Sequence, residues 1–291
     1  MRRVHVESAE PLESQRQNTR RVLGVVAIGV VLAVGVATAI GKAASYARLL
    51  HELRDAEALW LPLCLAGEVL AYVGYVIAYR ESAAVDDGPR LSVRSTLRIV
   101  AAGFGAMVLA TGAGTLAVDY WALRRAGAPP RDALARVIGL NTLEWAVLGG
   151  AATAAAAALA LGVDRGAPWG VLAPWLAVVP LCFAAAFWVT AERRYARLAA
   201  ERGGRIRRLF ATAVRAVRLV RLLLTRRAAT PGLGVGGAAL YWAGDVLCLW
   251  AGLRAFGVQL GLASLVLAYA TGYLVAALPL PAGGAGGVDA A

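Results

Sequence analysis

The chain has 291 residues, of which 59% are hydrophobic and 16% charged, and its mean hydropathy is +0.63. A soluble domain of this length needs more charge to cover its surface, and several apolar runs reach the roughly 18–20 residues that cross a bilayer. The sequence therefore predicts an all-α polytopic membrane protein, built as a helical bundle.

The net charge of +12 comes almost entirely from arginine, with Lys42 as the only lysine. In a soluble protein this excess would indicate nucleic-acid binding. In a membrane protein, arginine clusters mark cytoplasmic loops and contact anionic lipids. We therefore expect membrane lipids as partners and no nucleic acid.

Cysteine and histidine give no sign of a cofactor, a metal site or catalysis. The three cysteines lie far apart inside apolar runs, where inert buried thiols are expected, and the only histidines are His5 and His51. No zinc or haem spacing and no Ser-His-Asp or Cys-His constellation is available. We expect no cofactor and no enzymatic activity.

The chain order predicts a cytoplasmic tail followed by one transmembrane domain. Residues 1–21 are polar and irregular, which indicates a disordered tail, and residues 22–291 form the domain. Five runs have the length and apolarity of spanning helices: Val22–Gly41, Ala58–Tyr79, Val137–Gly162, Trp169–Thr190 and Gly232–Gly257. A sixth apolar stretch, Leu97–Val118, contains four glycines.

A basic segment of about residues 193–229 stands apart from the apolar runs. It holds twelve arginines between Arg193 and Arg227. Apolar residues recur on one helical face, namely Ile206, Leu209, Phe210, Ala213, Val217, Val220 and Leu224. This pattern predicts a basic amphipathic helix on the membrane surface, and a plain orientation signal is an equal alternative.

Arginine placement decides how many times the chain crosses. A basic N-terminal tail starts in the cytoplasm, so the span that ends near Arg80 returns the chain to the cytoplasmic side. Three apolar stretches then precede the arginine-rich segment. Three crossings would leave its arginines outside, so one stretch does not cross. We predict that the glycine-broken Leu97–Val118 is re-entrant, which requires that it is buried in protein or lines a wet cavity.

An internal repeat relates two parts of the chain. AGEVL at Ala66–Leu70 matches AGDVL at Ala243–Leu247, with an acid in the same position. Each copy is followed by a Gly-aromatic pair, Gly103-Phe104 or Gly272-Tyr273, and then by a glycine-rich break that ends in Val-Asp. The opposite crossing directions of the two copies predict an inverted repeat, which is an architecture of transporters. Repeat one covers about residues 58–190, and a partial repeat two covers about residues 232–291.

The C-terminal stretch LPLPAGGAGGVDAA is predicted to be a second re-entrant break. Prolines stop the helix and glycines allow a sharp turn and a close approach to a ligand; these residues are Pro279, Pro281, Gly283, Gly284 and Gly286. By the repeat, two further spans would follow Asp289. Because the chain ends at Ala291, we expect either a truncated product or a partner chain that supplies the pair.

Acidic residues inside the spans are the candidate functional residues. Glu68, Glu144 and Asp245 lie within apolar helices, where a charge costs on the order of 2.5–3.5 kcal/mol or more. They are predicted to form a proton or cation relay, or to bind an amine-bearing headgroup; a buried pairing with arginine or backbone is the alternative. Asp119 and Asp289 end the two breaks and join the predicted substrate path, with helix capping as their alternative. Gly103, Gly112 and Gly114 belong to the same path.

Two segments resemble a known family. FGAMVLATGAGTLAVDYWALRRAGAPPRDALARVIGLNTLEWAVLG, from Phe104 to Gly149, resembles the middle of the flippase-like proteins of the lysylphosphatidylglycerol synthase transmembrane-region family, with Leu123, Arg124 and Gly127 at its "aLr..G" element and Glu144 at the acid of the next helix. LPLPAGGAGGVDAA resembles the family's "lPlpGGlGxxE" signature, with Asp289 where the family usually has Glu.

The resemblance implies an integral protein of the bacterial inner membrane that moves polar lipids. Some members carry a fused aminoacyl-transferase domain, which this chain lacks. We expect a flippase-like protein for anionic or aminoacylated lipids, with Arg124 and Arg125 gathering headgroups at the cytoplasmic face. The alternative is a non-transporting scaffold for an envelope-lipid or glycan assembly enzyme, and a homo-oligomer or a membrane-protein partner fits either function.

Overall fold

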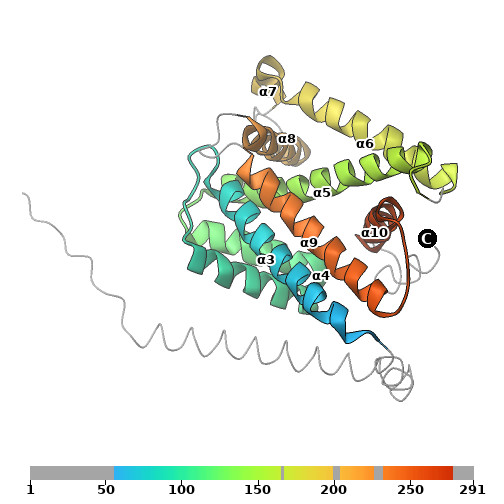
Figure 1. The fold of residues 1–291 in the computed structure, drawn as a ribbon. Helices are drawn as coiled ribbons and strands as arrows, with labels where there is room; N and C mark the ends of the chain where they lie inside the picture. The colour runs from blue at the N-terminus through green and yellow to red at the C-terminus, as the bar shows by residue number, and fades with distance from the viewer. Residues whose placement is uncertain (1–55, 165–166, 199–203, 226–231, 278–291) are drawn as a thin grey trace, which may run out of the picture. The chain divides into compact units, whose positions relative to one another are not determined.

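The structure is a computed structural model that describes residues 56–164, 167–198, 204–225 and 232–277 (Figure 1). All regular structure in these ranges is helical. The elements, in chain order, are a 3-10 helix η1 (Ala58–Trp60), α3 (Leu61–Ala84), α4 (Val93–Arg125), α5 (Pro130–Ala160), α6 (Trp169–Val189), α7 (Glu192–Leu198), α8 (Arg205–Leu224), α9 (Leu233–Ala255) and α10 (Leu262–Ala277).

Four helical stretches are long and apolar enough to cross a membrane. They are η1 with α3 (Ala58–Ala84), α5, α6 and α9, while α10 is apolar but has only 16 residues. The prediction of an all-α polytopic membrane protein is confirmed. The predicted span Val22–Gly41 and the C-terminal break at 278–291 lie outside the described residues.

The chain divides into two compact units. Of the described residues, the first unit holds 98–119, which is the middle of α4, and the second holds the two ends of α4 and the other helices.

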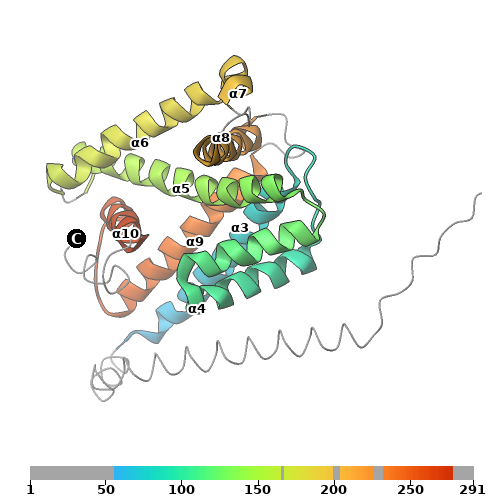
Figure 2. The ribbon, with the colours of Figure 1, turned by 180° about the vertical axis from the view of Figure 1, so that it is seen from behind.

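In the first unit, the middle of α4 folds back on itself. The Thr115 hydroxyl donates a hydrogen bond to the Gly103 carbonyl at 3.1 Å, although twelve residues of straight helix would separate these positions by about 18 Å. A Cβ on Gly114 would collide with the Ala106 carbonyl. Figure 2 shows the two arms side by side near the α4 label. Glycine therefore allows the parts of α4 before and after the bend to touch. The bend lies in the glycine-rich stretch Leu97–Val118.

In the second unit, α3 and α9 cross at glycines. A Cβ on Gly67 would lie 2.6 Å from the Gly244 carbonyl oxygen, and a Cβ on Gly237 would lie 2.6 Å from the Ala78 nitrogen. Numbers rise along α3 as they fall along α9, so the two helices are antiparallel, and Figure 1 shows them in contact along their lengths. Small residues that let backbones approach closely are typical of helix pairs in membranes.

The two copies of the AGEVL/AGDVL motif meet at this crossing. A Cβ on Gly67 would lie 2.7 Å from the Cys248 nitrogen, and a Cβ on Gly244 would lie 2.5 Å from the Ala71 nitrogen. Gly244 and Cys248 hold the positions in the second copy that Gly67 and Ala71 hold in the first. Each copy therefore contacts the other through the same position, as a local two-fold axis between the copies would produce.

A buried arginine joins the end of α3 to the beginning of α5. Arg136 Nη1 donates hydrogen bonds to the carbonyls of Ser82, Ala83 and Val85 at 3.3, 3.0 and 2.6 Å. The guanidinium thus satisfies carbonyls that a helix end leaves without partners. Because this end of α3 contacts the beginning of α5, the chain between them returns to the end of the bundle from which it left. The re-entrant path predicted for Leu97–Val118 stays a prediction.

The other ends of the helices also meet in pairs. Asp164 Oδ2 accepts hydrogen bonds from the Ser264 hydroxyl at 3.0 Å and the Ser264 N–H at 3.4 Å, which caps the beginning of α10. The Glu57 N–H donates to the Ala255 carbonyl at 2.9 Å, which joins the beginning of η1 to the end of α9. The loop after α5 and the loop after α9 therefore lie together, as alternating crossings predict.

The basic segment forms two helices, α7 and α8. One face of α8 packs against α5, where a Cβ on Gly139 would lie 3.4 Å from the Ala216 carbonyl oxygen. The buried face of α8 holds Ala211, Val214, Ala216, Val220 and Leu223. Most of the predicted apolar face is exposed, including Ile206, Leu209, Phe210 and Leu224, and is therefore open to lipid. The placement of α8 on the membrane surface stays a prediction.

Candidate functional site

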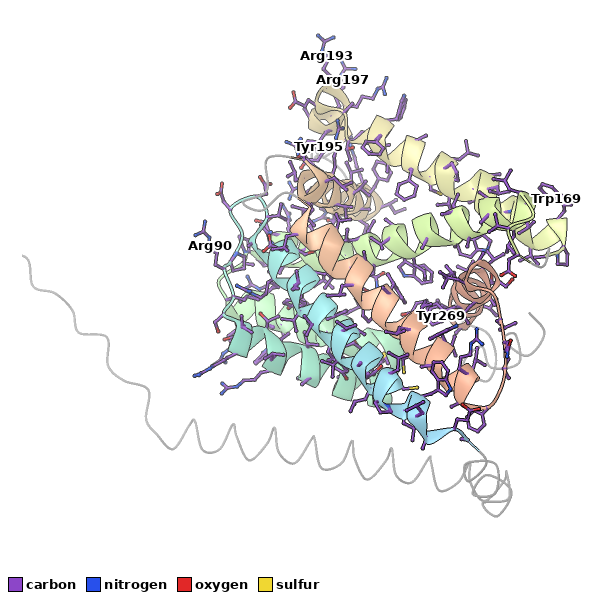
Figure 3. All side chains as sticks on the ribbon, viewed as in Figure 1. Arg90, Trp169, Arg193, Tyr195, Arg197 and Tyr269 are labelled. Carbon is purple, nitrogen blue, oxygen red and sulfur yellow. The ribbon has the colours of Figure 1, made fainter. Side chains whose placement is uncertain are left out.

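Five aromatic rings from three helices form a continuous cluster in the second unit, and the Tyr75 ring on α3 adjoins it at 5.3 Å from the Tyr241 ring. The five are Trp145 on α5, Tyr241 and Trp242 on α9, and Tyr269 and Tyr273 on α10. The Trp242 ring lies at the centre, with ring centroids 4.6 Å from Tyr241, 5.9 Å from Tyr269 and 4.9 Å from Tyr273. Such edge-to-face and tilted contacts are favourable arrangements of aromatic pairs. Figure 3 labels Tyr269 between α10 and α9.

Helix geometry explains why these rings converge. Tyr269 and Tyr273 are four residues apart on α10, so they lie on the same face, and their rings stack at 6.1 Å. The buried Trp242 donates its indole N–H to the Glu144 carbonyl at 2.8 Å, which fixes α9 against α5. The polar end of this buried ring thus has a hydrogen-bond partner, as expected.

Three carboxylates accompany the rings. The Tyr269 hydroxyl donates a short hydrogen bond to Asp245 Oδ2. Asp245 and Glu68 lie next to Gly244 and Gly67, where α9 and α3 touch, and Glu144 lies where the Trp242 indole reaches α5. The structure therefore brings together the three intramembrane acids that the sequence singled out. We call the five rings with Glu68, Glu144 and Asp245 the acidic aromatic cluster.

The cluster combines negative charge with aromatic faces. Glu144 is 9% exposed, Asp245 is half-buried and Glu68 is exposed on the surface of α3. Within the described part of the chain, no arginine or lysine forms an ion pair with Glu68 or Asp245. Ring faces and carboxylates both attract cations, most strongly where water is scarce. The arrangement therefore suits an ammonium group that enters from the membrane.

The other predicted path residues lie elsewhere. Asp119 is buried inside α4, six residues before that helix ends, so it does not cap a helix end and the capping alternative was wrong. Gly103 and Gly114 form the contacts of the α4 fold-back, with Gly112 in the chain between them. Asp289, Pro279, Pro281, Gly283, Gly284 and Gly286 lie outside the described residues.

The two predicted headgroup arginines act within their own segment. Arg124 Nη1 donates to the Ala128 carbonyl at 2.7 Å, and the Arg125 guanidinium lies over the Trp121 ring at 5.6 Å. Both are exposed in the last turn of α4, where positive charge is favourable. Their predicted role in gathering headgroups stays a prediction.

Sequence reasoning missed the tyrosines and tryptophans of the cluster. In the sequence, Tyr273 stands out only as part of a repeated Gly-aromatic pair, and Tyr269 has no such pattern. The available signal was the spacing of four between these residues on a short apolar helix, together with the adjacent pair Tyr241-Trp242 three residues before Asp245. Aromatic residues are common in apolar runs, so this spacing alone does not indicate a site. It does so only once the structure places the acids beside the rings.

Comparison with known proteins supports the family assignment. The sequence family described as Lysylphosphatidylglycerol synthase TM region matches residues 22–291. No curated protein and no solved structure matches significantly. The match covers nearly the whole chain, including every described helix. This multi-pass membrane protein therefore belongs to the lysylphosphatidylglycerol synthase transmembrane-region family.

Proposed function

We propose that the protein is a flippase-like membrane protein of the bacterial inner membrane, which binds and moves polar lipids whose headgroups carry an amine. The observation that carries this proposal is that three carboxylates and five aromatic rings gather where α3, α5, α9 and α10 meet. The family, named for lysylphosphatidylglycerol, supports a role with lipids.

The physical basis is the cost of taking an ammonium headgroup across hydrocarbon. A charge at the bilayer centre is expensive, and carboxylates with aromatic faces offset part of that cost. Asp245 and Glu68 would attract the amine, while the rings would shield it from the acyl chains. The acyl chains would stay in the membrane throughout.

The architecture supports movement between two faces. The reciprocal crossing of α3 and α9 fits the inverted repeat, in which broken helices meet near the midplane of a transporter. The fold-back of α4, between an end of α3 and a beginning of α5 that contact each other, supports a re-entrant hairpin. The proposal gives the chain no catalytic step, because binding and movement are sufficient.

Lipid translocation in proteoliposomes tests this function. Labelled aminoacylated and anionic phospholipids would be followed with wild type, Glu68→Gln and Asp245→Asn. Asp87→Asn is the matched control, because Asp87 is exposed in a loop and its φ of 57° suits asparagine. We expect faster movement of the aminoacylated lipid, reduced at least tenfold by either substitution in the cluster and unchanged by the control. A tenfold loss corresponds to about 1.4 kcal/mol.

The scaffold alternative predicts a different result. Lipid movement would equal that of empty liposomes for every variant, and an envelope enzyme would co-purify in stoichiometric amount. Movement that Glu68→Gln and Asp245→Asn leave intact would also contradict the proposed path through the cluster.

A further inference from the structure

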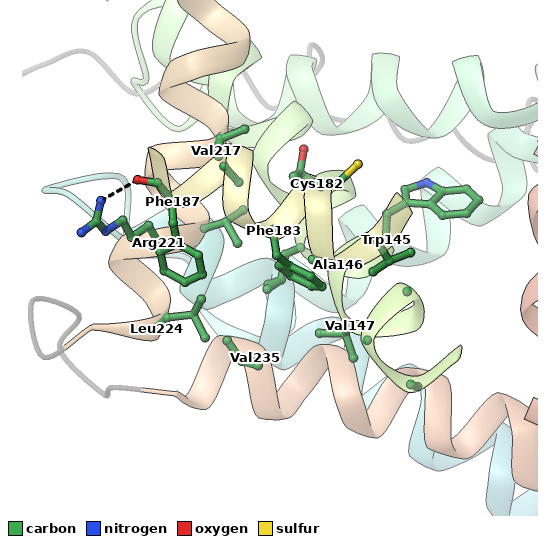
Figure 4. A pocket seen from close by; sticks show the side chains of 18 of the residues that line it. Trp145, Ala146, Val147, Cys182, Phe183, Phe187, Val217, Arg221, Leu224 and Val235 are labelled. Atoms are coloured by element: carbon green, nitrogen blue, oxygen red, sulfur yellow. Dashed lines mark hydrogen bonds between the residues drawn. The ribbon is translucent and has the colours of Figure 1, made fainter. Parts of the chain in front are cut away.

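A separate apolar groove runs between α5, α6 and α8. Its volume is about 700 Å³, and single residues of α9 and α10, Val235 and Leu274, complete its wall. The lining is almost entirely apolar, with Phe183 and Val179 on α6 facing Ala146 and Gly150 on α5. Figure 4 shows Arg221 at one end of the groove and Trp145 at the other. A hollow this apolar in a membrane protein suits hydrocarbon.

The charged end of the groove is built by Arg221 on α8. Its Nη1 donates to the Thr190 hydroxyl at 3.2 Å and to the Phe187 carbonyl at 3.4 Å. A guanidinium carries five N–H donors in a planar fork that matches phosphate. Since both bonds to described residues use Nη1, the Nη2 and Nε hydrogens remain for a ligand at the groove mouth.

Further positive charge surrounds this end. The Arg218 guanidinium lies 4.0 Å from the Tyr195 ring, and the Arg194 guanidinium lies 4.1 Å from the Trp188 ring. These contacts hold both arginines where α6, α7 and α8 meet, and Figure 3 shows further arginines of α7 at the same corner. This end therefore attracts anions, in contrast to the acidic aromatic cluster.

The groove is longer than one lipid leaflet is thick. Along α6 and its C-cap the lining extends from Trp175 to Thr190, which is about 22 Å along a helix. The hydrocarbon of one leaflet is about 15 Å thick, half of a roughly 30 Å core. One acyl chain can therefore lie along the groove with its headgroup at Arg221.

We propose that this groove is a binding site for a phospholipid with an anionic headgroup, with one acyl chain between α5 and α6 and the phosphate at Arg221. The proposal goes beyond the amine-recognising cluster and does not rest on it. The two sites have opposite charge, and Trp145 belongs to both, since it lines the groove and its ring centroid lies 5.3 Å from that of Tyr273.

Photo-crosslinking with defined lipids tests the proposal. The full chain would be placed in nanodiscs of phosphatidylcholine with a trace of phosphatidylglycerol that carries a photoactivatable acyl chain, and the labelled peptides would be identified by mass spectrometry. The same acyl chain on phosphatidylcholine is the comparison. We expect labelling of α6 and α5 around Phe183 and Gly150, roughly fivefold stronger for the anionic lipid, as expected for one arginine near an anionic headgroup.

Two pairs of variants separate the groove from the general surface. Arg221→Gln should lower the ratio of labelling by the anionic lipid to labelling by phosphatidylcholine to about one. Arg207→Gln, at an exposed position of the same helix, should leave this ratio unchanged. Gly150→Leu should fill the groove and abolish labelling there by both lipids, because a Cβ at Gly150 meets nothing within 4 Å. Gly236→Leu on α9, where a Cβ is equally unobstructed, is its control.

The outcomes distinguish this site from the proposed function. Asp245→Asn should leave the labelling unchanged even where it stops lipid movement. Equal labelling by the two lipids in wild type would overturn the proposal, because the groove would then hold bulk lipid without selection. Labelling that Gly150→Leu does not reduce would overturn it as well.

Discussion

Single residues determine both the chemistry of the acidic aromatic cluster and the contacts that hold helix ends together. Glu68, Glu144 and Asp245 could be predicted from the sequence, because an acid in an apolar run is conspicuous and costly. Arg136 could not, because an arginine at the edge of a span looks like an ordinary loop charge. The structure shows it buried, with its guanidinium satisfying the end of α3. Its role depends on a contact more than fifty residues away in sequence.

Replacement of Arg136 by methionine should destabilise the protein strongly. The substitution keeps an apolar stem but leaves the carbonyls of Ser82, Ala83 and Val85 without this donor, at a cost of roughly 3 kcal/mol. Thermal unfolding in detergent should show a clear decrease in Tm. Arg208→Met, at an exposed position of α8, should change Tm little. Equal Tm values for the two variants would contradict the role of Arg136.

Helices as elements were predictable where their composition is strongly apolar. The runs predicted at Ala58–Tyr79, Val137–Gly162, Trp169–Thr190 and Gly232–Gly257 correspond to α3, α5, α6 and α9, with ends displaced by a few residues. The sequence could not show which faces pack. The contact glycines, Gly67 and Gly74 on α3 and Gly237 and Gly244 on α9, share a spacing of seven residues, but the spacing alone does not show which helices pair.

The α3–α9 crossing should fail when a glycine at the contact gains a side chain. A Cβ on Gly74 would collide with the Tyr241 backbone nitrogen, and backbone has little room to yield. We expect Gly74→Leu to abolish monodisperse protein in size-exclusion chromatography. Gly252→Leu on α9, where a Cβ meets nothing within 4 Å, should elute like wild type. A monodisperse Gly74→Leu protein with unchanged Tm would show that the crossing is not tight.

The fold-back of α4 predicts a disulfide that a straight helix forbids. A Cβ on Gly103 would lie 3.3 Å from Thr115 Cγ2 and 4.0 Å from its Cα, within the range that a disulfide spans. In a background with the three native cysteines replaced by alanine, Gly103→Cys/Thr115→Cys should form an intramolecular disulfide, seen as a 2 Da mass loss. Leu240→Cys/Gly252→Cys, equally spaced in α9, should not. Free thiols in both pairs would rule out the fold-back.

At the scale of the whole molecule, the arginine distribution predicts the arrangement of helix ends. The ends predicted to be cytoplasmic meet at Arg136 and α3, and the ends predicted to be external meet at Asp164–Ser264 and Glu57–Ala255. Charge predicts which helix ends share a side because loop arginines are counted without any knowledge of packing. Counting arginines could not predict how the helices pack, because packing follows from side-chain shape. It is this packing that places the acids beside the aromatic rings.

Labelling from either side of the membrane tests this orientation. Single cysteines at Arg90 and Arg193, both exposed near predicted cytoplasmic ends, should resist a membrane-impermeant maleimide in intact cells and react after permeabilisation. A cysteine at Val163, 74% exposed in the loop after α5, should react in intact cells. The reverse pattern would mean that the chain is inserted the other way round.

The most direct test of the central claim is the affinity of the purified protein in nanodiscs for an aminoacylated phospholipid, measured beside the same lipid with its amines acetylated. The pair differs only in the positive charge that the acidic aromatic cluster is proposed to recognise. We predict that acetylation weakens binding about tenfold, as loss of a cation–π and carboxylate contact implies, and that Asp245→Asn reduces this difference. Equal affinity for the two lipids in the wild-type protein would contradict the account.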